Sequence, residues 1–74
     1  MDRVTLYNIT KEVEQRIHKA VRSNITPGGK VTFYTVDFNG SGSITISMKK
    51  LVTEPGDDYD VQIKKIVEAL QHAH

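Results

Sequence analysis

The sequence contains no cysteine and no tryptophan, and only two of its 74 residues are proline. Without cysteine the fold cannot depend on disulfide bonds, and a zinc site built from thiolates is excluded. No apolar run approaches the length of a membrane-spanning helix, and residues 1–7 lack the apolar core of a signal peptide. We therefore expect a cytoplasmic protein that makes no contact with a membrane.

A chain of 74 residues is long enough for one domain, and we predict a single domain over residues 1–74. A domain of this size buries only about 60–65% of its unfolded surface, which leaves little room for an enclosed substrate cavity. The formal net charge is +1, but residues 1–50 carry a balance of +4 and residues 51–74 a balance of −3. This asymmetry could help the chain to dock on a charged partner, although small domains often show as much by chance.

Residues 30–50 predict an antiparallel β-hairpin. Two runs rich in β-branched and aromatic residues flank Asn39-Gly40-Ser41-Gly42, and Asn-Gly favours a tight turn because both residues tolerate positive φ. Alternation then predicts an inner face that packs on helices, formed by Val31, Phe33, Thr35, Ile44, Ile46 and Met48. The outer face would contain Thr32, Tyr34, Val36, Phe38, Ser41, Ser43, Thr45 and Ser47. A loop with one residue more or fewer would exchange the faces of one strand, so the register stays open.

An amphipathic helix is predicted on each side of the hairpin. The first covers residues 10–23 with Thr10 as its N-cap, and its apolar stripe comprises Ile9, Val13, Ile17, Ala20 and Val21. Residues 23–29 then end this helix in a loop that contains Pro27 and Gly28. The second helix covers residues 57 to about 72. Its acidic start suits the positive end of a helix, and its stripe comprises Tyr59, Ile63, Ile66, Val67 and Leu70.

Residues 3–7 alternate weakly between apolar and polar side chains, and they can form either a short edge strand or the start of the first helix. We prefer the strand, because valine, threonine and tyrosine are poor helix formers. The predicted fold class is therefore α+β: a small (β)αββα domain in which two helices pack on one face of an antiparallel hairpin sheet.

No motif in the sequence indicates catalysis, a cofactor or a metal. Gly28-Gly29-Lys30 lacks the spacing of a phosphate-binding loop and precedes a strand rather than a helix. The run Asp57-Asp58-Tyr59-Asp60 lacks the glycine that an EF-hand calcium loop needs at its sixth position, so helix capping explains it better. His72 and His74 do not share a helix face, and no serine lies in a nucleophile-elbow pattern. We therefore expect no enzyme, no cofactor and no metal site.

Two surfaces are candidate binding sites. The first is the outer hairpin face, represented by Tyr34, Val36, Phe38 and Thr45. The second is the polar side of the first helix, where helical spacing lines up a basic ridge of Lys11, Gln15, Lys19 and Arg22. Each surface also has an explanation that involves no binding. Other segments can cover the aromatic residues, and the ridge can be an ordinary solvated helix face.

The leading hypothesis is a non-enzymatic protein-interaction domain that docks on a larger protein, or on a second copy of itself, through the hairpin face. Small proteins of this kind are often regulators, inhibitors or assembly factors, and many are encoded by phages or mobile elements. The alternative is a small nucleic-acid-binding protein that contacts phosphates with the basic ridge. An enzyme or a ligand carrier is the third hypothesis, and it would need a pocket between two subunits. An open edge strand could also pair with its twin in a homodimer.

Overall fold

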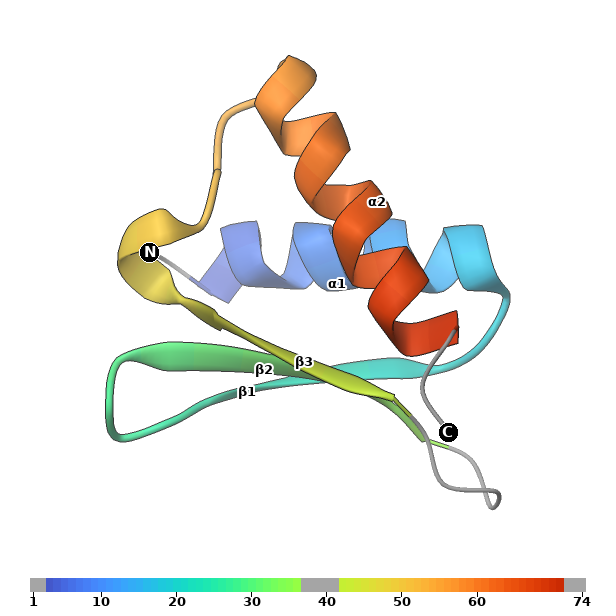
Figure 1. Ribbon diagram of the computed structural model, residues 1–74, viewed down its shortest axis with the longest axis horizontal. Coiled ribbons are helices and arrows are strands. Elements are labelled where there is room, and N and C mark those ends of the chain that lie inside the picture. Colours follow the sequence, from blue (N-terminus) through green and yellow to red (C-terminus); the bar gives the residue numbers. More distant parts are fainter. Residues whose placement is uncertain (1–2, 37–41, 72–74) are drawn as a thin grey trace.

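The computed structural model describes residues 3–36 and 42–71 as two helices packed on one face of a three-stranded antiparallel sheet (Figure 1). The elements follow one another as α1 (Arg3–Ile17), β1 (Val21–Ile25), β2 (Lys30–Thr35), β3 (Ser43–Ser47), the short 3-10 helix η1 (Met48–Lys50) and α2 (Asp57–Gln71). The strands lie side by side in chain order, with β2 in the centre. The α+β class predicted from the sequence is confirmed, but the third strand is not where we expected it.

The N-terminal segment is helical, so the predicted strand at residues 3–7 is wrong. The apolar residues that α1 buries recur at helical spacing; they are Leu6, Ile9, Val13 and Ile17. This burial outweighs the weak helix propensity of Val4 and Thr5, because tertiary packing contributes more to a helix than propensity does. Thr10 lies inside α1 and is not the predicted N-cap. Its Oγ1 donates a hydrogen bond to the carbonyl oxygen of Leu6 at 2.8 Å.

α1 ends at Ile17, and the next residue, His18, adopts a left-handed conformation with a φ of 57°. The His18 N–H still donates to the carbonyl oxygen of Glu14 at 2.9 Å, which closes the last helical turn. The chain then turns back to form β1, so the helix predicted over residues 10–23 begins too late and extends past the true end of α1. Val21 lies four residues after Ile17, so the apolar spacing of the helix continues across this boundary although Val21 belongs to the strand.

A tight turn joins β1 to β2 within residues 23–29, the segment that we predicted as a helix-ending loop. The Gly29 N–H donates to the Thr26 carbonyl oxygen at 3.1 Å, and the Thr26 N–H donates to the Lys30 carbonyl oxygen at 2.8 Å. Gly29 has a φ of 78°, which residues with a side chain rarely adopt. Pro27 suits the second position of the turn because its ring fixes φ. The Thr-Pro-Gly-Gly segment is therefore a hairpin loop between two strands.

The β2–β3 ladder confirms the predicted faces of the second hairpin for the residues that the structure describes. Toward the helices the ladder forms the pairs Val31–Ile46 and Phe33–Ile44, and on the opposite face it forms Thr32–Thr45 and Tyr34–Ser43. The turn that we assigned to Asn39-Gly40-Ser41-Gly42 falls, apart from Gly42, outside the described residues, and so does Phe38.

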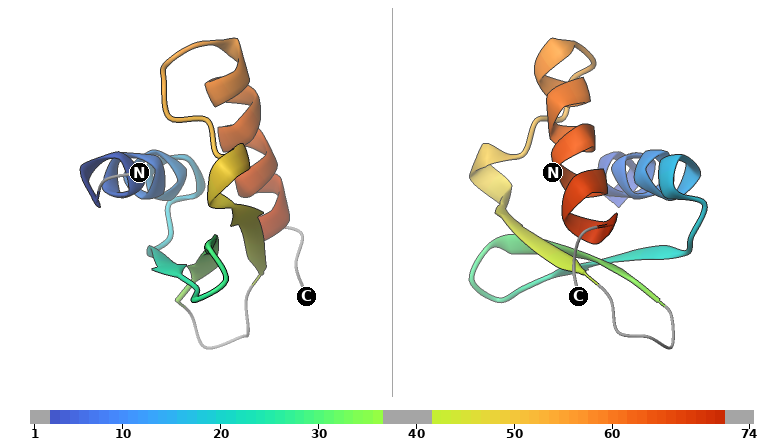
Figure 2. Two further views of the ribbon diagram at one scale, coloured as in Figure 1. Left: turned by 90° about the vertical axis from the view of Figure 1, so that its left-hand side faces the viewer. Right: turned by 45° about the vertical axis from the view of Figure 1, so that its right-hand side comes forward.

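The core lies between the sheet and the helix layer, in which α2 crosses α1 (Figures 1 and 2). Its fully buried side chains come from both layers: Phe33, Ile9, Ile63, Ile66, Val13 and Val31. α2 begins at Asp57 as predicted, and the three aspartates of its first turn suit the positive end of the helix dipole. Residue 72, near which we expected α2 to end, lies outside the described residues. Among the described residues, both helices pack on the same side of the sheet.

Candidate functional site

Because α1 and α2 lie on the same side, no described segment covers the opposite face of the sheet (Figures 1 and 2). We call this the open face. Alternation along the strands assigns to it Arg22, Asn24, Lys30, Thr32, Tyr34, Ser43, Thr45 and Ser47. Six of these eight residues are exposed, and Thr32 and Ser47 are half-buried. The open face is therefore a polar surface built on regular strands.

Tyr34 lies on the central strand and is 37% exposed, with Arg22 on β1 and Ser43 on β3 as its cross-strand neighbours. Val36 lies two residues further along and is 54% exposed. The Val36 N–H donates to the Ala20 carbonyl oxygen at 3.1 Å, so pairing continues beyond the strands and keeps Val36 on the side of Tyr34. The described segments thus leave both predicted residues accessible to a partner.

Thr45 is exposed on β3 and pairs with Thr32 on β2. Their Oγ1 atoms lie 2.9 Å apart and share a hydrogen bond in which either hydroxyl can be the donor. The open face, as far as the structure describes it, carries two basic residues, Arg22 and Lys30, and no carboxylate. The structure therefore brings three of the four residues predicted for the hairpin face to one exposed surface: Tyr34, Val36 and Thr45.

The predicted basic ridge does not exist as a single helix face. Its residues are divided among α1, the connection that follows and β1; they are Lys11, Gln15, Lys19 and Arg22. The prediction is wrong because it required a helix that reaches residue 23, and α1 ends at residue 17. Arg22 belongs instead to the open face, beside Tyr34.

Lys11 and Glu14 form a salt bridge on α1, with 3.0 Å between Nζ and Oε1. The Lys11 ammonium also lies 5.5 Å from the centre of the Tyr7 ring, and its hydrogen bond to Glu14 raises the pKa of Lys11 above its ordinary value. Glu14 Oε2 accepts a hydrogen bond from the Val21 N–H at 3.0 Å. This bond, followed by the one from Lys11, lowers the pKa of Glu14. Glu14 therefore ties α1 to the first residue of β1.

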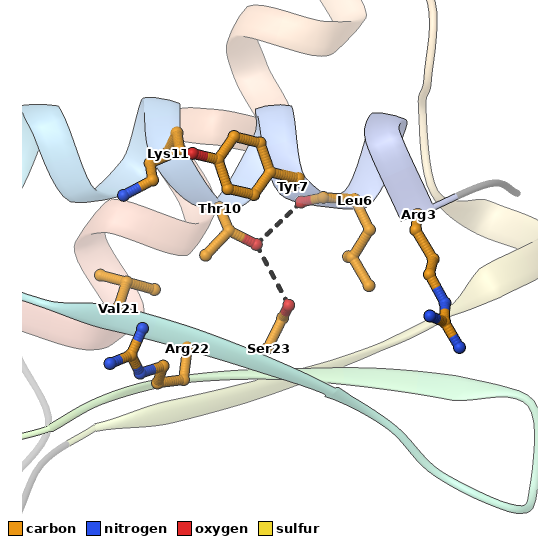
Figure 3. Close-up of a pocket in the computed structure, with 8 residues that line it drawn as sticks. All are labelled: Arg3, Leu6, Tyr7, Thr10, Lys11, Val21, Arg22 and Ser23. Atoms are coloured by element: carbon orange, nitrogen blue, oxygen red, sulfur yellow. Dashed lines mark hydrogen bonds between the residues drawn. The ribbon is translucent and has the colours of Figure 1, made fainter.

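A groove of about 270 Å³ runs between α1 and the free edge of β1 (Figure 3). We call it the β1 groove; its lining residues are Arg3, Leu6, Tyr7, Thr10, Lys11, Val21, Arg22 and Ser23. A hydrogen bond of 3.2 Å joins Thr10 Oγ1 and Ser23 Oγ across it. All three charged lining residues are basic. Sequence reasoning missed this groove because it missed β1, although a Pro-Gly turn between two β-prone runs is a hairpin signal that could have revealed it.

A second cavity, of about 400 Å³, lies between β3 and α2. This β3 pocket is lined by Ile44, Ile46, Lys50, Val52, Asp58, Val61, Gln62 and Lys65. The lining of neither cavity holds two carboxylates or a hydroxyl beside a histidine, which are common catalytic pairs. Within residues 3–36 and 42–71, no three His, Cys, Asp or Glu side chains gather where they could hold a metal ion. That the protein is not an enzyme stays a prediction.

Neither models of protein families, nor curated proteins, nor solved structures yielded a match to this chain. Among the described residues, neither α1 nor α2 has the length and apolar character needed to cross a membrane. Function is therefore inferred from the geometry and charge of the open face and of the two cavities.

Proposed function

We propose that this chain is a small protein-interaction domain, without catalytic activity, that docks on a larger partner protein through the open face. The observation that carries the proposal is the Arg22–Tyr34 cross-strand pair, which is exposed on a sheet face that no described segment covers. Tyrosine and arginine are enriched among the residues that dominate binding energy in protein interfaces, because both combine a large contact area with directional hydrogen bonds. Val36 adds exposed apolar area beside them.

The chemistry of the open face supports a partner with an acidic surface. Arg22 and Lys30 are its only charged residues within the described part of the chain, and both are basic. Hydroxyl groups such as that of Thr45 can exchange hydrogen bonds with a partner directly or through water. A second copy of the same face would bring these basic residues against their own counterparts, so charge disfavours a homodimer formed here. A cytoplasmic regulator, inhibitor or assembly factor would need such a surface and no catalytic group.

Nucleic-acid binding stays a prediction, but the helix ridge on which it depended is not formed. The described open face has two cations, whereas DNA-binding domains usually present a larger basic excess that neutralises many phosphates. A nuclease step in the experiment below separates the two possibilities, because a complex bridged by nucleic acid dissolves when that nucleic acid is digested.

The test compares proteins captured from the source cell by three immobilised chains after nuclease treatment. The first is the natural chain, and the second carries Tyr34→Ser with Val36→Ser. The third is a control with Val4→Ser and Val61→Ser, which removes exposed apolar side chains from the two helices instead. Circular dichroism confirms that all three are folded.

We expect the natural chain and the control to retain the same protein. The open-face variant should bind that protein at least about tenfold more weakly. Capture of a protein alone does not support the proposal; its dependence on the open face does. Retention of the same protein by all three chains, or no retention after nuclease treatment, would contradict it.

A further inference from the structure

β1 is an edge strand, with β2 on one side and the β1 groove on the other. In an antiparallel ladder, successive residues direct their main-chain groups to opposite sides. The Thr26 N–H donates to the Lys30 carbonyl oxygen at the end of this ladder, so the even-numbered residues of β1 direct their main-chain N–H and C=O groups toward β2. The odd-numbered residues direct their N–H and C=O groups outward; they are Val21, Ser23 and Ile25.

One of these outward groups is already occupied, because the Val21 N–H donates to Glu14 Oε2 at 3.0 Å. No hydrogen bond within residues 3–36 and 42–71 reaches the outward main-chain groups of Ser23 and Ile25. A row of unpaired main-chain groups on an edge strand is a template to which another extended segment can add. The accessible part of the β1 edge therefore begins at Ser23.

The β1 groove offers space for the side chains of such an added strand. Successive side chains of such a strand would point alternately into the groove, on the helix side of the sheet, and toward the open face. On the groove side, Leu6 and Val21 provide apolar contact and the Thr10–Ser23 pair provides hydroxyl groups. The groove and the main-chain edge are therefore arranged along the same line.

The charges at the β1 groove select an acidic segment. Figure 3 shows Arg3 at one end and Lys11 with Arg22 at the other. Lys11 is paired with Glu14, whereas Arg3 and Arg22 have no salt-bridge partner among the described residues. Carboxylates of an added strand would supply these partners. A second copy of β1 would bring Arg3 and Arg22 against their own counterparts, so charge disfavours self-pairing at this edge.

We infer that the β1 edge accepts an extended acidic segment of the partner protein as a fourth strand of the sheet. The inference rests on the interaction function proposed above and adds the chemistry of the partner: peptide groups that pair with Ser23 and Ile25, and carboxylates that reach Arg3 and Arg22. Nucleic acid is anionic but has no row of peptide groups to pair with a strand, and the groove presents only three cations. The favoured occupant is therefore a polypeptide.

The test titrates a capped hexapeptide of alternating glutamate and valine into the full chain labelled with ¹⁵N. We expect amide resonances to shift at Ser23, Ile25 and the groove residues, and hydrogen exchange of the Ser23 and Ile25 amides to slow. Two control peptides separate the contributions of charge and main chain. One replaces every glutamate by lysine, and the other keeps the charges but is methylated on every amide nitrogen. We expect neither control to produce these changes.

A pair of matched variants tests the charge selection. Arg3→Gln with Arg22→Gln should weaken binding of the acidic peptide about fivefold to thirtyfold, as expected for two exposed ion pairs. Lys49→Gln with Lys64→Gln removes the same charge at residues outside the groove and should leave the affinity within about twofold. Both variants replace exposed side chains, so both should remain folded.

Several results would overturn the inference. These are no shifts at millimolar peptide, shifts confined to β3 or to the open face, equal binding of either control peptide, and equal weakening by the two variants. Tighter binding of a thymidine oligonucleotide of equal charge at the same residues would assign the groove to nucleic acid. Protection of the Ser23 and Ile25 amides that depends on protein concentration would assign it to a second copy. None of these results removes the open-face proposal, which the Tyr34 and Val36 variant tests separately.

Discussion

The side chain of Gln62 holds both main-chain polar groups of Val52. The Val52 N–H donates to Gln62 Oε1 at 2.8 Å, and Gln62 Nε2 donates to the Val52 carbonyl oxygen at 2.9 Å. Gln62 is only 7% exposed, although its side chain is polar. Residues 51–56, which connect η1 to α2, form neither helix nor strand. The amide of Gln62 therefore serves this connection as a neighbouring strand would, by pairing its main chain.

Replacing Gln62 should destabilise the fold. Gln62→Leu keeps the side chain about the same size but removes both hydrogen bonds to Val52, and we expect a loss of about 1–3 kcal/mol in the free energy of unfolding. Gln15→Leu, at an exposed glutamine of α1, should change it by no more than about 0.5 kcal/mol. Urea unfolding measures both. Equal losses in the two variants would show that the Gln62–Val52 pair contributes nothing specific.

The Glu14 carboxylate should make stability depend on pH. Its pKa is lower in the folded chain than the ordinary value of 4.5, because the Val21 N–H and the Lys11 ammonium stabilise the ionised form. Its contribution is therefore present above the ordinary value and disappears as the pH falls through the lowered one. Glu14→Gln should lose less stability than the natural chain on acidification from about pH 5 to pH 3.

Glu12→Gln is the matched control for Glu14→Gln. Glu12 is also a glutamate of α1, but its carboxylate accepts hydrogen bonds from the side chain of Arg16 on the surface, at 3.2 and 3.4 Å. It makes no such bond to the main chain of β1. Thermal unfolding at a series of pH values should therefore show a nearly natural pH dependence for this control. An identical pH dependence in the natural chain and Glu14→Gln would refute the assigned role of Glu14.

Replacing His18 with glycine should stabilise the fold. Its φ of 57° lies in the left-handed region, which is unfavourable for residues with a side chain and free of strain for glycine. We expect His18→Gly to raise the free energy of unfolding by about 1 kcal/mol, which corresponds to roughly 4–8 °C in Tm for a small domain. Ala20→Gly, nearby but without positive φ, should lower it by about 0.5–1 kcal/mol. A lower Tm in both variants would contradict this expectation. It would mean that a contact of the His18 side chain stabilises the fold by more than its left-handed backbone destabilises it.

The second hairpin and α2 could be predicted because their signals are local. The alternation from Val31 to Val36 predicted which side chains share a face, and the structure shows that Tyr34 and Val36 lie exposed on the outer one. In α2, the aspartates from Asp57 onward precede an apolar stripe that contains Ile63 and Ile66, so both the start and the buried side followed from sequence.

β1 and the beginning of α1 could not be predicted so directly, because their local signals conflict with their final structure. Val21 extends the four-residue spacing of the α1 stripe but belongs to a strand, and Val4 and Tyr7 favour a strand but belong to a helix. Burial of Leu6 and Ile9 against the sheet decides the helix, and that contact is tertiary. The β1 groove requires both elements to be placed correctly: the Pro27-Gly28 turn could have indicated β1, but no local signal indicated the beginning of α1.

Two adjacent residues of β2, Phe33 and Tyr34, should differ strongly in how much they contribute to the stability of the fold. Phe33 is fully buried beneath the helices, whereas Tyr34 is 37% exposed on the open face. Phe33→Ala should cost about 3–5 kcal/mol because it leaves a cavity in the core. That is a large part of the roughly 4–11 kcal/mol expected for a domain of this length. Tyr34→Ala should cost only about 1–2 kcal/mol, because it removes β-propensity and a cross-strand contact with Arg22 but no core packing.

Urea unfolding of the two variants measures this difference directly. If Tyr34→Ala costs as much as Phe33→Ala, the tyrosine is part of the folding core, and a loss of partner binding in Tyr34 variants would report only a damaged fold. If the costs differ as expected, a folded chain does not require a tyrosine on the open face. The effect of Tyr34→Ser on partner capture can then be attributed to the interface, because the strand that carries it remains in place.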